Sequence, residues 1–163
     1  MNSDQSSEMP SNQPASQQYS LSKWLLIGIM IASFIGFSDA TYLTIQHFTG
    51  ASVKCIVSSG CDTVTTSEYA IVFGIPMALL GALFYLGIFL FTILYFDIRK
   101  RVLMYLVSLG TVFGFLFSLY LIYLQIFVLH AICEYCMLSA TTSTILFVFG
   151  LIVFFKLRYR QTQ

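Results

Sequence analysis

Four long apolar runs, separated by short polar stretches, dominate the sequence. The runs cover residues 24–46, 71–96, 102–128 and 132–155. Each is long enough to cross a bilayer as a helix, which takes about 20 residues. Residues 1–20 are rich in Ser, Gln, Asn and Pro and have no apolar periodicity, so we expect a disordered polar tail there. The pattern predicts an all-α integral membrane protein, with a four-transmembrane-helix bundle over residues 21–158 and an outer loop, residues 47–70, that carries a cysteine pair.

Composition supports a membrane protein and narrows its partners. The 163 residues are 58% hydrophobic and only 9% charged, which is typical of integral membrane proteins. The net charge is +1 and there is no basic stripe, so nucleic acid is not an expected partner. The expected partner is the lipid bilayer. At this length we expect one membrane domain and no attached soluble catalytic domain.

The basic residues predict how the helices are oriented in the membrane. Seven of the eight basic residues fall in the amino-terminal flank, the second connection and the carboxyl-terminal flank: Lys23, Arg99, Lys100, Arg101, Lys156, Arg158 and Arg160. Basic flanks stay on the cytoplasmic side, so both termini are expected there. The cysteines then all lie on the extracytoplasmic side, where disulfides form and persist.

Two cysteine pairs carry the candidate chemistry. Cys55 and Cys61 lie in the outer loop, and Cys133 and Cys136 form a Cys-x-x-Cys motif where the fourth apolar run begins. The positive end of a helix macrodipole favours a thiolate at such a place. A loop pair and a helix pair on one membrane face form the layout of a disulfide relay, in which electrons pass by thiolate attack. Cys136 lies one turn deeper, within reach of a lipid-soluble oxidant such as a quinone.

Other interpretations of the polar residues remain open. Four cysteines allow three pairings, so two structural disulfides could staple the outer loop of a non-enzymatic membrane protein. Four thiolates could also bind zinc, but an oxidising exterior opposes this and we expect no metal. Asp39 is either a hydrogen-bonded residue or part of a proton path to a quinone, because ionisable groups inside a span are costly. His47 and His130 are expected to be interfacial.

Several stretches make the chain resemble the vitamin K epoxide reductase family, in its bacterial branch. They are Ser38-Asp-Ala-Thr-Tyr-Leu-Thr44, Cys55-x5-Cys61-Asp62, Ser67-Glu-Tyr-Ala-Ile-Val-Phe-Gly-Ile-Pro76 and Cys133-Glu-Tyr-Cys136. The resemblance extends from about Leu25 to Phe155. It implies a four-helix bundle around a quinone, which would be ubiquinone, menaquinone or a vitamin K-type naphthoquinone.

The resemblance also implies roles for single residues. It places Cys136 next to the quinone, as the residue that passes electrons to it. Cys133 would exchange with Cys61, and Cys55 would meet the thiols of a partner protein. Phe73 matches a position in the wall of the family's quinone pocket. The resemblance thus implies a quinone-dependent thiol oxidase, a redox-active enzyme of the bacterial inner membrane that drives disulfide-bond formation.

Some features depart from the family pattern. In the animal enzymes that reduce vitamin K epoxide, an Asn precedes the Phe of the Phe-Gly pair by three residues and a Tyr follows the last cysteine by four. Here those places hold Ala70 and Ala140, which favours quinone reduction over the alternative, vitamin K quinone or epoxide reduction. Many bacterial members carry a fused thioredoxin-like domain. This sequence ends at Gln163, so the expected partner is a separate thioredoxin-like or DsbA-like protein. The disulfide-bond protein B family also has two cysteine pairs, but in the reverse order, so this sequence resembles it less.

Overall fold

The computed structural model describes residues 23–50, 52–53, 55, 60–72 and 74–159. Parts of the sequence on which predictions were made lie outside the described residues. These parts are the tail at residues 1–20, Lys54, Phe73 and Arg160.

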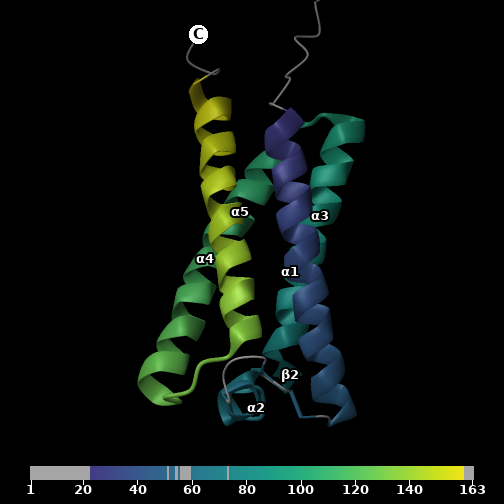
Figure 1. The fold of residues 1–163 in the computed structure, drawn as a ribbon. Coiled ribbons are helices and arrows are strands. Elements are labelled where there is room, and N and C mark those ends of the chain that lie inside the picture. Colours follow the sequence, from purple (N-terminus) through teal and green to yellow (C-terminus); the bar gives the residue numbers. More distant parts are fainter. Residues whose placement is uncertain (1–22, 51, 54, 56–59, 73, 160–163) are drawn as a thin grey trace, which may run out of the picture.

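Four long helices make up the molecule (Figure 1). They are α1 (Lys23–Thr49), α3 (Met77–Ile98), α4 (Arg101–Tyr123) and α5 (Glu134–Tyr159). A π-helical turn, η2 (Leu124–Val128), continues α4. By length and composition, four segments can each cross a membrane: α1, α3, α4 together with η2, and α5. The predicted all-α four-helix membrane bundle is confirmed.

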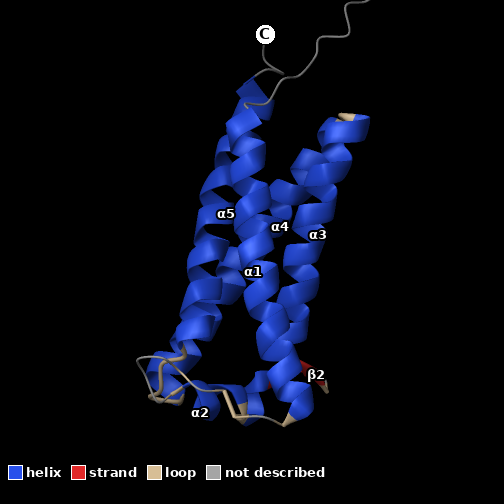
Figure 2. Ribbon diagram, turned by 45° about the vertical axis from the view of Figure 1, so that its right-hand side comes forward, coloured by secondary structure: helices blue, strands red, loops and turns tan. Residues whose placement is uncertain are grey.

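Short elements occupy the chain between α1 and α3. They are α2 (Cys61–Thr65), the 3-10 turn η1 (Glu68–Ala70), and the strands β1 (Ile71–Val72) and β2 (Ile75–Pro76). The two strands pair antiparallel, with Val72 opposite Ile75. Figure 2 shows α2 and β2 at the same end of the bundle. These elements together form a compact cover over one end of the four helices.

The second long helix begins at Met77, rather than near residue 71 as the apolar pattern predicts. Two backbone conformations explain the difference. Gly74 has a φ of +79°, which glycine adopts readily and which makes the turn of the hairpin. Pro76 is extended, with φ −59° and ψ 130°, and precedes the helix. Hydropathy alone cannot separate a short apolar hairpin from the helix that follows it. The last helix, in turn, begins at Glu134 and continues to Tyr159.

The helices form a closed ring of neighbours. Helix α1 packs against α3 and α5, and α4 packs against the same two helices. The α3–α4 connection is a tight turn in which Arg99 adopts a left-handed conformation with φ 53° and donates its backbone N–H to the Tyr95 carbonyl at 2.9 Å. The start of α1, this turn and the end of α5 lie at one end of the bundle, and the α2 region lies at the other (Figure 1). The compartment that each end faces stays a prediction.

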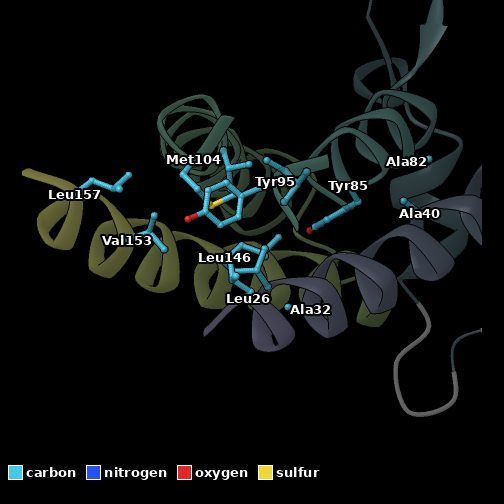
Figure 3. Close-up of a cluster of buried hydrophobic side chains, with 13 residues drawn as sticks. Leu26, Ala32, Ala40, Ala82, Tyr85, Tyr95, Met104, Leu146, Val153 and Leu157 are labelled. Atoms are coloured by element: carbon cyan, nitrogen blue, oxygen red, sulfur yellow. The ribbon is translucent and has the colours of Figure 1, made fainter. Parts of the chain in front are cut away.

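A buried apolar cluster holds the four helices together (Figure 3). Ile29, Met104, Val107, Leu146 and Val153 are fully buried in it. Hydroxyl groups that share this interior bond to backbone carbonyls of their own helices, as those of Ser33, Thr44, Thr92 and Thr111 do. This satisfies them without water, which a bilayer interior requires. The Ser108 hydroxyl instead donates across the α4–α5 interface to the Gly150 carbonyl at 3.0 Å.

We predict that Gly150→Ala destabilises the bundle by about 1–3 kcal/mol, the usual cost of an overpacked interface. A Cβ at this position would overlap the Thr111 hydroxyl and lie 3.5 Å from the Ser108 Cα, so α4 and α5 would have to separate. Unfolding in detergent measures the change. Gly87→Ala is the matched control, since no atom lies within 4 Å of its added Cβ. Equal stability of the two variants would contradict the prediction.

Candidate functional site: two cysteine pairs and an apolar cavity

The structure brings all four predicted cysteines into one cluster at the α2 end of the bundle. Cys61 and Cys133 are completely buried, at 0% exposure, and pack with Leu43. Cys55 and Cys136 are partly buried and pack against the same cluster. Residues separated by more than seventy positions in the sequence are therefore neighbours in space, which thiol–disulfide exchange between the two pairs requires.

The loop pair is joined as a disulfide. Cys55 and Cys61 are bonded, with their Cα atoms 5.6 Å apart. Helix α2 begins at Cys61, and the Cys61 backbone N–H donates to the Cys55 sulfur at 3.2 Å. Because Cys61 is buried and Cys55 is only partly buried, Cys55 is the sulfur of this pair that a partner can approach from outside.

The helix pair consists of two cysteines that are not joined to each other. Cys133 immediately precedes α5, in the position of an N-cap. Its sulfur accepts the backbone N–H of Cys136 at 3.4 Å, and its carbonyl accepts that of Met137 at 3.0 Å. A side-chain hydrogen bond from Cys136 lowers the pKa of the Cys133 thiol, and this backbone N–H adds to the effect. The helix start therefore favours a thiolate at Cys133.

Gly60 brings the loop pair against the backbone next to Cys133. A Cβ placed on Gly60 would lie 2.6 Å from the Ile132 carbonyl oxygen and 2.8 Å from the Ile132 nitrogen. Backbone atoms cannot move aside as a flexible side-chain end can. Only a residue without a side chain allows α2 to dock this closely. The sequence pattern gave no indication of this role.

Gln125 supports the same segment from the interior. Its side-chain oxygen Oε1 accepts the Cys133 backbone N–H at 2.9 Å, and its main-chain carbonyl accepts the N–H of Ala131 at 3.1 Å. Gln125 is 3% exposed and lies in the π-helical turn η2. The residues just before α5 are thus held between Gln125 on one side and Gly60 on the other. Sequence reasoning missed Gln125, although a polar residue inside an apolar span is a signal that could have identified it.

A cavity of about 630 Å³ lies beside the helix pair and includes Cys136 in its wall. Its lining is mostly apolar and comes from all four long helices and from the segment between α1 and α3. Lining residues include Leu43, Met77, Leu80, Phe84, Phe113, Phe117, Leu121 and Leu124. Pockets for small organic ligands have this size and character. Among the described residues, no group of three or more His, Cys, Asp or Glu side chains could hold a metal ion.

The other predicted site positions fall in different places. Ala70 and Ala140 both line the cavity. His47, expected to be interfacial, lines it as well. Asp39 is buried, at 7% exposure, but does not line the cavity. The next residue, Ala40, does line it. Phe73 lies outside the described residues.

Hydroxyl groups form a small polar network at the α3–α5 side of the cavity. The Tyr85 hydroxyl donates to the Ser139 carbonyl at 2.6 Å and lies 3.1 Å from the hydroxyls of Ser139 and Thr142. Tyr85 and Ser139 both line the cavity. The sequence offered no means of choosing Tyr85 among ten tyrosines, because only packing distinguishes it from those that face lipid.

Comparison with known proteins agrees with this geometry. Residues 27–151 match the vitamin K epoxide reductase family, and this match covers well over half of the chain. The protein belongs to this family. It is also similar to the thiol-disulfide oxidoreductase LTO1 of Arabidopsis thaliana, with 40% identity over 48 residues. That stretch is 29% of this chain and only 13% of the relative, so the similarity concerns a small part of a much longer protein.

Family membership agrees with the cysteine arrangement but does not assign roles to single residues. The matched range contains all four cysteines, the cavity-lining parts of all four helices and Gln125. Gly60 also falls within it. The role of each residue is therefore argued from its contacts in this structure.

We predict that Gly60→Ala slows thiol exchange between the two cysteine pairs by about 10- to 100-fold, the usual effect of displacing reacting groups by about 1 Å. Gly60 has a φ of −88°, which alanine adopts without strain, so the effect is steric. Rapid acid quenching followed by thiol labelling measures the exchange after a reduced dithiol is added. Thr63→Ala, an exposed change on the same short helix, is the control. Exchange at the unaltered rate in Gly60→Ala would show that α2 need not dock this closely.

Proposed function

We propose that the protein is a quinone-linked thiol oxidase. It takes electrons from a thioredoxin-like or DsbA-like partner and passes them to a quinone, so that disulfide formation in the partner continues. One observation carries the proposal: Cys61 and Cys133 are buried in one cluster, and Cys136 beside them lines an apolar cavity. The family match and the name of the LTO1 relative support a thiol–disulfide role.

The burial of the four sulfurs supports one direction of electron flow. Cys55 is the accessible member of the loop pair, Cys61 and Cys133 are enclosed together, and Cys136 lines the cavity. A protein partner therefore reacts at Cys55, exchange between the pairs occurs at Cys61 and Cys133, and electrons leave from Cys136. This is the order that the family resemblance implies.

Each step exchanges one disulfide for another. A partner thiolate attacks Cys55 and releases Cys61, and the second partner thiol resolves this bond, which oxidises the partner and reduces the loop pair. Cys61 then attacks Cys133 of an oxidised helix pair and releases Cys136. Finally Cys55 attacks Cys61, which re-forms the loop disulfide and releases Cys133. The lowered pKa of Cys133 makes it a good leaving group in this last step.

The pairing in the structure suits the stage after this transfer. The loop cysteines are joined and the helix cysteines are not, which is the pairing expected once Cys133 and Cys136 hold two electrons. A bound quinone supplies an acceptor for two electrons and two protons. The predominantly apolar cavity fits a quinone ring and the start of its isoprenoid tail. Ubiquinone, menaquinone or a vitamin K-type naphthoquinone all have this chemistry.

The alanines in the cavity favour a quinone substrate over an epoxide. Opening an epoxide needs a donor that protonates the oxygen as the ring breaks. Ala70 and Ala140 line the cavity with methyl groups, at the positions where the resemblance to epoxide-reducing enzymes expects Asn and Tyr. Quinone reduction is therefore the activity that these residues suit best.

Asp39 is proposed to handle the protons of this reaction. It is the only carboxyl group that is buried among the described residues, and neither of its oxygens has a hydrogen-bond partner there. Its neighbour in α1, Ala40, lines the cavity that also has Cys136 in its wall. A buried carboxyl group without a structural bond is costly to retain. A role in accepting protons from the thiols and releasing them toward the cavity explains its place.

The orientation is part of the proposal. The cysteine end of the bundle faces the extracytoplasmic side of a bacterial inner membrane, and both termini lie in the cytoplasm. The basic residues at the opposite end of the described chain, Lys23 and the Arg99–Arg101 turn among them, support this.

The relay makes different predictions for two cysteines. Cys136→Ala should abolish quinone reduction with every thiol substrate, because no sulfur remains at the cavity. Cys55→Ala should abolish turnover with a thioredoxin-like protein but keep part of the turnover with a small dithiol, which can reach sulfurs that a protein cannot. Quinone absorbance measured with both substrates tests this.

Two results would contradict the relay. One is quinone turnover by Cys136→Ala. The other is an equal loss of both activities in Cys55→Ala. If the wild type does not turn over, and thiol trapping shows that no cysteine pairing changes with dithiol or quinone, the disulfide is a staple and the protein is not an oxidase.

Asp39→Asn should lower the quinone reduction rate by about 100-fold, near the low end of what a positioned proton donor or acceptor contributes. Asn has the same shape, so exchange between the cysteine pairs should stay near the wild-type rate. Single-turnover measurements separate these two steps. Ser38→Ala is the matched neighbouring control, because its exposed hydroxyl bonds to the Phe34 carbonyl of its own helix. Wild-type quinone reduction by Asp39→Asn would remove Asp39 from the proton path.

A further inference from the structure

Gln125 connects three parts of the site through one residue. Its Oε1 atom accepts the Cys133 backbone N–H at 2.9 Å, and its main-chain carbonyl accepts the Ala131 N–H at 3.1 Å. The same residue lines the cavity that contains Cys136 in its wall. Its side chain thus connects the lining of the cavity to the Cys133 backbone.

The π-helical turn makes this double contact possible. The Leu129 N–H bonds to the Leu124 carbonyl at 2.9 Å, five residues back rather than four. The wider turn leaves the Gln125 carbonyl free to accept from Ala131, beyond the end of the helix. Single π-helical turns occur often at functional sites. Here the turn positions Gln125 to bind the connection to α5 with its main chain and its side chain together.

The Cys133 N–H depends on this contact. Cys133 is completely buried, and a buried amide without an acceptor is destabilising. With the amide held, the Cys133 sulfur stays at the start of α5, where the Cys136 N–H reaches it at 3.4 Å. Without it, the residue is free to rotate away from the helix axis, and the thiolate loses both this donor and the helix dipole.

We propose that Gln125 is a positioning residue for Cys133. Its side-chain carbonyl holds the Cys133 amide, which keeps the sulfur at the N-terminus of α5 and stabilises it as a thiolate. Cys133 can then leave readily when Cys55 re-forms the loop disulfide. The inference rests on the proposed thiol chemistry of Cys133, but it does not depend on a quinone.

The test isolates the helix pair and needs no quinone. In purified full-length protein carrying Cys55→Ser and Cys61→Ser, the Cys133–Cys136 pair is equilibrated with glutathione redox buffers across pH. The redox potential of the pair is then plotted against pH. The pH at which the slope of this plot changes equals the pKa of the more acidic thiol. With Gln125 intact, this pH should lie below the ordinary range for cysteine, as expected for a pKa lowered by hydrogen bonding.

Gln125→Leu keeps the size of the side chain and removes the acceptor. Loss of one hydrogen bond should move the slope change to higher pH by about 0.5–1 unit. Gln125→Asn keeps the amide but is one methylene shorter, so the slope change should move in the same direction by a smaller amount. This variant decides the question if Gln125→Leu does not fold.

Ser108→Ala is the control for a purely structural effect. It also removes a buried hydrogen bond from α4, the 3.0 Å bond to Gly150, at a place far along the helix from the cysteines. It should lower stability without moving the slope change. The inference is overturned if neither Gln125 variant moves the slope change, or if Ser108→Ala moves it equally. A shift in the Gln125 variants of a protein that fails to reduce quinone would overturn the proposed function and leave this inference standing.

Discussion

Direct contact between a loop and a helix start is the constraint on which the site depends. Disulfide exchange requires one sulfur to reach another, so electrons cannot pass between the pairs at a distance. The approach of Gly60 to the Ile132 backbone makes the contact possible, and the burial of Cys61 and Cys133 together results from it. The proposed relay therefore depends on packing at this one interface.

The membrane interior imposes the second constraint, because polar groups there must find partners within the protein. Most buried hydroxyls bond to their own helix, as Thr92 does to the Ile88 carbonyl. The connection before α5 is harder to satisfy, since it is buried and not helical. Gln125 satisfies it with two acceptors. Three residues are exceptions among the described residues: the Asp39 carboxyl group and the hydroxyls of Thr41 and Ser143 are buried without a hydrogen-bond partner.

One face of α5 carries Cys136 and lines the cavity. Cys136, Ser139, Ala140 and Ser143 are spaced at three and four residues, so they follow one face of the helix toward the middle of the bundle. This face turns away from lipid and toward α3 and α4. A ligand in the cavity is thereby next to Cys136, while Cys133, three residues earlier, packs with Cys61 of the loop pair.

The sequence by itself determined the class of fold and the chemistry, because both depend on local patterns. Four apolar runs of spanning length require four helices, and the spacing of Cys133 and Cys136 indicates redox chemistry at a helix start. Only the tertiary structure decided where α3 begins, since the hairpin at Gly74 is as apolar as the helix. It alone also revealed Gly60 and Gln125, because their roles are contacts with distant backbone atoms, and no periodicity in a single sequence records such contacts.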